Sequence, residues 1–270
     1  MVKQLLKHEF IYYIRTFGLF LPIVLAMGVM TKVCLLLNNE TLVSTLAISS
    51  SVMMLAVSCF ALMLMASFIG IVRFYKNMYG AEGYLTLTLP VSHAQHIFVK
   101  LFVALVAEAA CLLTVILSVL IAGAGPALSE LLAIFGNAFR ELSVLAGVPN
   151  MLAYALEILL LVVLAGAGNM LLFYACITIG QLAKKNRILL AIGAYFIYYM
   201  ATQVLGTVFT ILFAMLSETY LMKLIFEWAV ANPIPAVHIY FFVSILISAA
   251  MAAVFWIITQ WIMSKKLNLE

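Results

Sequence analysis

Long apolar runs dominate the chain and alternate with short polar stretches. Six runs are long enough to cross a bilayer, because a spanning helix needs about 20 mostly apolar residues. They cover residues 17–37, 46–72, 97–122, 151–179, 188–216 and 237–263. The pattern predicts an all-α polytopic membrane protein, with six transmembrane helices in one domain over residues 1–270.

Three stretches outside these runs have a helical period but mixed polarity. In residues 1–16 the apolar positions form one stripe and Lys3, Lys7 and Arg15 lie off it, which predicts an interfacial helix. The alternative is a plain extension of the first span. Residues 123–150 and 217–236 predict outer amphipathic segments, and the Pro-rich break over 232–235 is typical of a re-entrant or capping element.

Composition narrows the possible chemistry. The chain is 67% hydrophobic and 9% charged, and all ten acidic residues are Glu. The lack of Asp excludes an aspartyl intramembrane protease and an Asp-rich metal site, and no nucleotide-binding GxxxxGK[ST], HExxH or GxSxG motif occurs. The four cysteines form no CxxC pair, and His93 with His96 lacks a third ligand. We therefore expect no catalytic residue, no metal site and no cofactor in this chain.

The basic residues predict the orientation, because Lys and Arg concentrate in cytoplasmic flanks. With six spans both termini face the same side. That side carries Lys3, Lys7, Arg15, Arg73, Lys76, Lys100, Lys184, Lys185, Arg187, Lys265 and Lys266, and the other side carries Lys32, Arg140 and Lys223. Both termini are therefore expected in the cytoplasm, and the net charge of +4 indicates topology rather than a nucleic-acid surface.

Polar residues inside the predicted spans are candidate functional residues, since they are costly in lipid. Glu108 in the third span and Glu157 in the fourth are intramembrane carboxylates, with structural hydrogen bonding as the alternative. A polar stripe on the fifth span and two serines of the second predict a pathway or a dimer seam, with ordinary helix packing as the alternative. These residues are Tyr195, Tyr199, Thr202, Gln203, Gly206 and Thr210, with Ser51 and Ser58.

The segment 73–96 on the predicted cytoplasmic side has an unusual apolar ladder. Leu85, Leu87 and Leu89 alternate with polar residues, which favours a strand, but Leu85 and Leu89 also suit a short helix. Pro90 ends this element, and Ser92 followed by Gln95 predicts a capping box that opens the third span. An apolar side held outside the bilayer indicates a docking surface.

This segment resembles the loop between the second and third spans of ABC-transporter permeases of the second exporter type. The resemblance rests on RFYKNMYGAEGYLTLTLPVS, on IGQLAKKNRILL after the fourth span and on the tail KKLNLE, which are similar to permeases of Firmicutes. It implies a permease in the plasma membrane of a Gram-positive bacterium. It also implies that the loop is a coupling segment that docks on the ATPase. The docking residues would be Glu82, Gly83, Tyr84, Leu85, Leu89 and Pro90.

The resemblance further implies the partners. They are two copies of a separate ATPase, which would hold ATP and Mg²⁺, and a second permease copy or a homologous permease, all within membrane lipid. The expected function is ATP-driven export of a hydrophobic or amphipathic peptide, lipid or drug. A module that senses antimicrobial peptides or confers immunity to them, and a membrane scaffold without an ATPase, are the alternatives.

Overall fold

The apolar runs of the sequence form long helices in the computed structural model. The model describes residues 2–37, 39, 41–80, 83, 91–183 and 185–265. At residues 126, 127 and 131 it describes the backbone only. Within these residues all regular structure is helical. The chain divides into two compact units, Met1–Glu141 and Leu142–Glu270, and each is described by itself.

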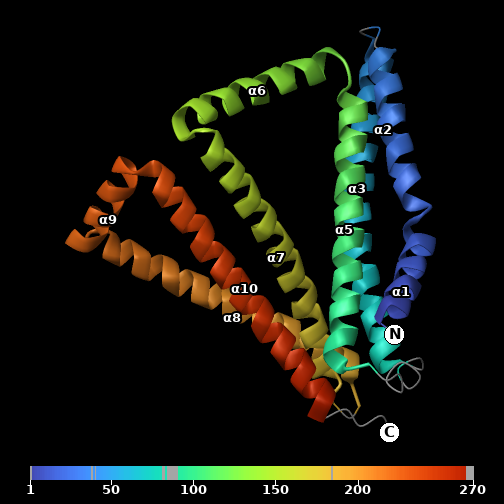
Figure 1. Ribbon diagram of the computed structural model, residues 1–270. Helices are drawn as coiled ribbons and strands as arrows, with labels where there is room; N and C mark the ends of the chain where they lie inside the picture. The colour runs from blue at the N-terminus through green and yellow to red at the C-terminus, as the bar shows by residue number, and fades with distance from the viewer. Residues whose placement is uncertain are drawn as a thin grey trace. The chain divides into compact units, whose positions relative to one another are not determined.

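The described part of unit 1 contains four helices that pack together. They are α1 (Val2–Phe17), α2 (Phe20–Leu36), α3 (Leu42–Tyr79) and α5 (His93–Gly123). Helix α5 contacts α1, α2 and α3, and α2 also contacts α3, so the three long helices run side by side (Figure 1). The fully buried side chains gather where α3 ends and α5 begins, and include Phe74, Met78, Ile97 and Val99.

Helix α2 approaches α5 closely because Gly28 has no side chain. A Cβ atom at Gly28 would lie 2.6 Å from the carbonyl oxygen of Ser118. In lipid the hydrophobic effect does not drive helices together, so their contacts depend on close van der Waals packing. Small residues allow the two backbones to come close enough for such packing. Thr31, one turn further on, donates a hydrogen bond to the Ser51 carbonyl at 3.2 Å and joins α2 to α3.

Helix α6 (Pro126–Ala146) contains the boundary between the units and leads to the helices of unit 2. These are α7 (Val148–Gly180), α8 (Arg187–Ser217), α9 (Tyr220–Ala231) and α10 (Pro233–Lys265). Helix α7 packs along α10 and also contacts α8, while α9 joins α8 to α10 (Figure 1). The buried core lies toward the end of α7 and the end of α10, with Met170, Tyr174, Thr178 and Thr259 fully buried.

The six predicted spans are confirmed as helices. Among the residues that the structure describes, six segments are long and apolar enough to cross a membrane: Val2–Leu36, Leu42–Tyr79, His93–Gly123, Val148–Gly180, Arg187–Ser217 and Pro233–Lys265. The first of these includes both α1 and α2, which are separated only by a turn at Gly18 and Leu19. The helices of the predicted amphipathic stretches are also present, as α1, α6 and α9.

The break before the last span is shorter than predicted. It is confined to Asn232, and α10 begins at Pro233 rather than near residue 237. Proline suits the first turn of a helix, because backbone N–H groups in that turn form no hydrogen bond within the helix and the N–H that proline lacks is therefore not needed. Pro233 and Pro235 therefore start the last helix instead of separating it from α9.

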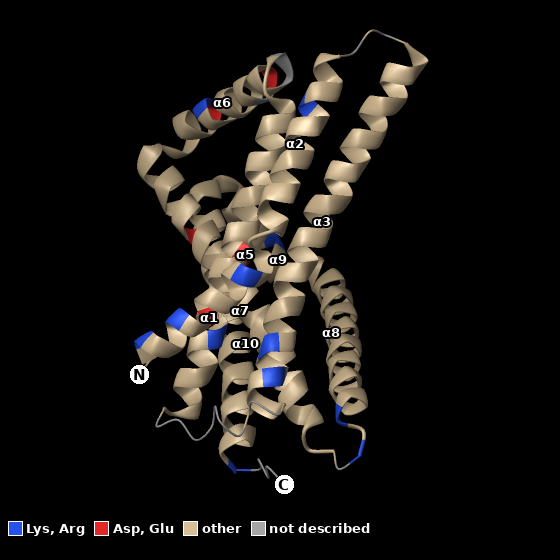
Figure 2. Ribbon diagram, turned by 90° about the vertical axis from the view of Figure 1, so that its right-hand side faces the viewer, with Lys and Arg blue, Asp and Glu red and all other residues tan. Residues whose placement is uncertain are grey.

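Basic residues gather at one end within each unit. In unit 1 they lie on α1, near the end of α3 and near the start of α5, with Lys32 and Arg140 as the exceptions. In unit 2 they lie in the connection from α7 to α8 and at the end of α10, with Lys223 of α9 as the exception. Figure 2 shows this distribution on the ribbon.

Candidate functional site

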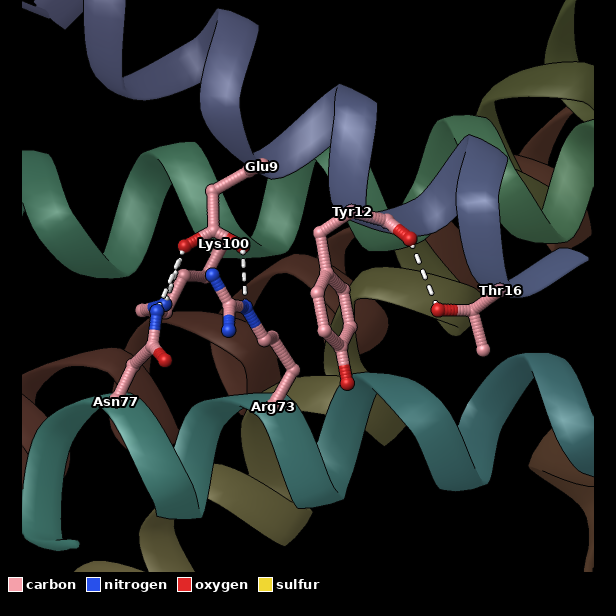
Figure 3. Close-up of polar contacts among 6 residues, drawn as sticks. All are labelled: Glu9, Tyr12, Thr16, Arg73, Asn77 and Lys100. Carbon is pink, nitrogen blue, oxygen red and sulfur yellow. Dashed lines mark hydrogen bonds and ion pairs between the residues drawn. The ribbon is translucent and has the colours of Figure 1, made fainter. Parts of the chain in front are cut away.

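Four polar side chains meet in the interior of unit 1 and form the Glu9 cluster: Glu9, Arg73, Asn77 and Lys100. Glu9 is only 3% exposed. Its Oε1 accepts hydrogen bonds from Lys100 Nζ at 2.8 Å and from Asn77 Nδ2 at 3.0 Å. Its Oε2 accepts from Arg73 Nε at 3.0 Å (Figure 3). One carboxylate therefore joins three helices.

Helical geometry brings these groups together. Glu9 lies on the buried face of α1, four residues before Tyr13, so both side chains point toward the same neighbours. Arg73 and Asn77 are four residues apart on α3 and reach the carboxylate from one face. The Arg73 guanidinium also lies 4.0 Å from the centre of the Tyr12 ring, a cation–π contact that adds a second link to α1.

The cluster has the charge balance that burial requires. Lys100 is 4% exposed, and an isolated buried ammonium or carboxylate would be very unfavourable. Pairing offsets that penalty only when the hydrogen bonds are well formed, and removal of one partner costs about 3–5 kcal/mol. The distances of 2.8 to 3.0 Å meet this requirement. The cluster therefore holds α1, α3 and α5 in one arrangement.

The position of the Glu9 cluster is as informative as its chemistry. Arg73 and Asn77 lie in the last two turns of α3, and Lys100 lies in the first turns of α5. The polypeptide between these two helices contains the predicted docking segment. Both helices that flank this segment are thus anchored to the same carboxylate of α1.

Glycines shape the end of α3. Gly80 ends the helix in extended backbone, and its amide donates to the carbonyls of Tyr75 and Lys76 at 3.1 and 3.2 Å. Gly83 is buried and donates from its amide to the Gly80 carbonyl at 2.8 Å. A Cβ atom at Gly83 would meet the Met78 carbonyl oxygen at 2.7 Å, so any other residue there would force a shift of the backbone.

The other predicted docking residues, Glu82, Tyr84, Leu85, Leu89 and Pro90, lie outside the described residues, as does the choice between strand and helix for this segment. The predicted capping box directly after it is present. The Gln95 amide donates to Ser92 Oγ at 3.3 Å, and the Ser92 amide donates to Gln95 Oε1 at 3.2 Å. This box gives α5 a defined start.

One atom of the Glu9 cluster and one neighbouring side chain have no hydrogen-bond partner within the described part of the chain. They are the Oδ1 atom of Asn77 and both ring nitrogens of His96, a residue that is 1% exposed. His96 lies one turn before Lys100 on α5. Buried polar atoms without partners are rare and mark places that deserve a functional explanation.

The predicted intramembrane carboxylate Glu108 links two helices of unit 1. Its Oε1 accepts a hydrogen bond from Ser67 Oγ of α3 at 3.0 Å. Glu108 is half-buried and lies two turns beyond Lys100 on α5. The hydrogen bond gives the carboxyl group a polar partner among apolar neighbours.

Glu157 of α7 has a partner that the sequence did not indicate. Its Oε1 lies 2.8 Å from Nδ1 of His238 on α10. The His238 ring packs against Tyr154, with 4.4 Å between ring centres, and the Tyr154 hydroxyl donates to the Ile234 carbonyl at 3.2 Å. This Glu157–His238 pair joins the early turns of α7 to the first turns of α10.

The predicted polar stripe of the fifth span lies on α8 in unit 2. No residue of α8 is buried. Thr202 and Thr210 donate to carbonyls of their own helix, at 2.8 Å each. Tyr195 stacks on Phe173 of α7, and Tyr199 is 48% exposed. Gln203 and Gly206 are exposed as well. The hydroxyl groups of the threonines are therefore satisfied within α8, whereas the side chains of Tyr199 and Gln203 are exposed.

The serines predicted on the dimer seam have local partners. Ser51 and Ser58 of α3 each donate to a carbonyl of the same helix, three residues earlier, at 2.8 Å. Lys3, Lys7 and Arg15 are exposed on α1. Among the described residues no group of three His, Cys, Asp or Glu side chains is placed to hold a metal ion.

Sequence reasoning missed Glu9, Asn77 and His238. Glu9 carried one signal, because it interrupts the apolar stripe of an otherwise amphipathic helix. A lone carboxylate on a buried face needs a cation, and Lys100 lies on another helix that a single sequence cannot pair with it. His238 sits in an apolar run with no distinguishing pattern.

The chain was compared with protein-family models, with curated proteins and with solved structures, and nothing matches in any of the three comparisons.

Proposed function

We propose that this chain is the membrane-spanning permease subunit of an ATP-driven exporter of the ABC type, with both termini in the cytoplasm. The six long apolar helices support a role within the membrane. The resemblance of residues 73–92 to the coupling loop of the second exporter type supports the ABC assignment.

The observation that carries the proposal is the place of the Glu9 cluster. A permease must pass movement of its ATPase into its spans, and a loop can do this only if its ends are firmly attached to them. The Glu9 carboxylate joins the end of α3, the start of α5 and α1. A force on the segment 81–90 would therefore move three helices together rather than bend one.

In this mechanism the chain supplies transmission and a pathway, and the separate ATPase supplies the chemistry. Two ATPase copies close on ATP and Mg²⁺ and pull on the docking residues of each permease. The Glu9 cluster passes that movement to α1, α3 and α5. The spans then tilt and open a path along the faces that two permeases present to each other.

The face of α8 suits such a path. It carries tyrosine, threonine and glutamine side chains and no charged residue between Ile188 and Ser217. A charge-free polar stripe favours a hydrophobic or amphipathic substrate over a strongly ionic one. The second permease copy or a homologous permease would cover this face.

The docking assignment is tested by charge substitution in the loop. The Leu85→Asp, Leu89→Asp double variant is purified through a tag on this chain, and the ATPase that accompanies it is quantified. We expect the ATPase to be lost, because two carboxylates cannot enter an apolar groove without a large desolvation penalty. Retention of the full amount of ATPase would refute the docking assignment.

Leu182→Asp is the matched control for this experiment. Leu182 is 44% exposed in the connection between α7 and α8, which lies on the same proposed side of the membrane. We expect this variant to keep the ATPase. The same purification separates the alternatives, because a scaffold brings no ATPase, and reconstitution in liposomes distinguishes an exporter from an immunity or sensing module by transport.

A further inference from the structure

An apolar groove runs between α1, the start of α2 and α5. Phe10, Tyr13 and Phe17 line it from one side and Ala107 and Ala110 from the other, around a cavity of about 150 Å³. Two features create it. The chain turns at Gly18 and Leu19 between α1 and α2, and the alanines of α5 leave the space that larger side chains would fill.

Basic residues lie at one end of this groove. Lys3 and Lys7 are exposed on α1, and they precede the groove residues Phe10 and Ile14 by seven residues each. Residues seven apart lie on nearly the same face of a helix, about 10 Å from one another along its axis. Lys3 and Lys7 therefore lie on one flank of α1, beside its buried stripe, and the apolar side chains of Phe10 and Ile14 follow them on this flank and line the groove.

The two lysines have no acidic partner among the described residues. Glu9, the nearest carboxylate in the sequence, is buried and is engaged by Arg73 and Lys100. An exposed pair of cations beside an apolar groove matches the two halves of an anionic phospholipid, a phosphate headgroup and an acyl chain.

We propose that this groove binds one acyl chain of an anionic phospholipid, with the phosphate held by Lys3 and Lys7. The alkyl chain would lie past Phe10 and Ile14 toward Ala107 and Ala110. An extended peptide would suit the groove poorly, because the apolar lining gives no partner to backbone amides and carbonyls. A second copy of the chain that docked here by the same face would bring its own lysines against these, which is unfavourable.

The site is independent of the proposed transport function, and the bound lipid would stabilise the turn between α1 and α2. Phe102 of α5 meets the groove residue Phe10 edge to face, with 6.4 Å between ring centres, and so packs against this side of α1. The lipid would thus contact α1 on the face next to the one that carries Glu9.

The test uses the purified full chain in detergent, without an ATPase. A photoactivatable phosphatidylglycerol with a diazirine in one acyl chain is compared with the phosphatidylcholine analogue, and crosslinked peptides are identified by mass spectrometry. We expect phosphatidylglycerol to label the residues of α1 and α5 that line the groove, and to do so more strongly than phosphatidylcholine. Equal labelling by the two lipids, or labelling spread over all helices, would overturn the proposal.

Two pairs of variants sharpen the result. Lys3→Gln with Lys7→Gln should lower the preference for phosphatidylglycerol by roughly fivefold for each lysine. Lys185→Gln with Lys265→Gln, exposed lysines of unit 2, should leave it unchanged. Ala110→Phe should block labelling in the groove, whereas Ala109→Phe, on an exposed position of the same helix, should not. Unchanged labelling in Ala110→Phe would show that the acyl chain lies elsewhere.

Discussion

At the scale of the residue, a single buried carboxylate organises unit 1. Glu9 accepts three hydrogen bonds from three side chains, two of them cationic. These donors take the place of the water molecules that would solvate an exposed carboxylate. Removal of the carboxylate or of one of its cationic partners should destabilise the protein, because the remaining charge stays buried without compensation. Apolar side chains buried where α3 ends and α5 begins add to this link between the helices.

Removal of this carboxylate should weaken the unit strongly. We expect Glu9→Ala to lower the free energy of unfolding by about 3–5 kcal/mol, because Lys100 stays buried without its carboxylate. Glu218→Ala is the control, since the Glu218–Lys223 pair is exposed and such pairs contribute about 0–1 kcal/mol. Unfolding midpoints in detergent micelles compare the two variants, and equal midpoints would contradict the role given to Glu9.

The Glu157–His238 pair gives a second prediction at this scale. His238→Phe keeps a ring against Tyr154 but leaves Glu157 without its partner, so we expect a loss of about 1–3 kcal/mol. Tyr154→Phe removes only the hydrogen bond to the Ile234 carbonyl and should cost less. Thermal unfolding of both variants measures this order, and a larger effect of Tyr154→Phe would show that the carboxylate does not depend on His238.

The sequence could not supply these partners. Glu108 and Glu157 were identifiable because a carboxylate inside an apolar run is conspicuous. Their partners Ser67 and His238 lie on other helices, and so does Lys100, the partner of Glu9. Tertiary pairs of this kind depend on how helices pack, which hydrophobic periodicity does not record.

At the scale of the element, the helices follow from the chain with little ambiguity. In lipid a spanning segment must form all its backbone hydrogen bonds internally, so each long apolar run becomes a helix. The predicted runs therefore match α2, α3, α5, α7, α8 and α10 closely. The ends differ for local reasons. Helix α3 continues beyond its apolar run to Tyr79, where its last turns carry the residues that reach Glu9, and Pro233 opens α10 early.

The close approach of α2 and α5 yields a prediction for glycines. Gly28→Ala should destabilise the protein by about 1–3 kcal/mol, because the new Cβ would lie 2.6 Å from the Ser118 carbonyl oxygen. Gly193→Ala on α8 has open space around it and should stabilise the helix by up to about 1 kcal/mol. Thermal unfolding of the two variants should therefore shift in opposite directions, and equal shifts would refute the tight α2–α5 contact.

At the scale of the whole molecule, most of the apolar surface has no partner within its own unit. Helix α8 buries no residue, and α9 also buries none. Lipid can cover apolar side chains, but it offers nothing to the tyrosines and Gln203 of α8. This surface, together with the anchoring of both helices that flank the predicted docking segment, is why we propose that the chain works in a complex with a second permease and two ATPase subunits.

The measurement that tests this central claim most directly is the native mass of the complex that the tagged chain brings with it from its own membranes. The account predicts two permease subunits and two copies of a separate ATP-hydrolysing subunit, with the ATPase lost in the Leu85→Asp, Leu89→Asp variant. An intact chain that is recovered alone, or only with copies of itself, would contradict the account.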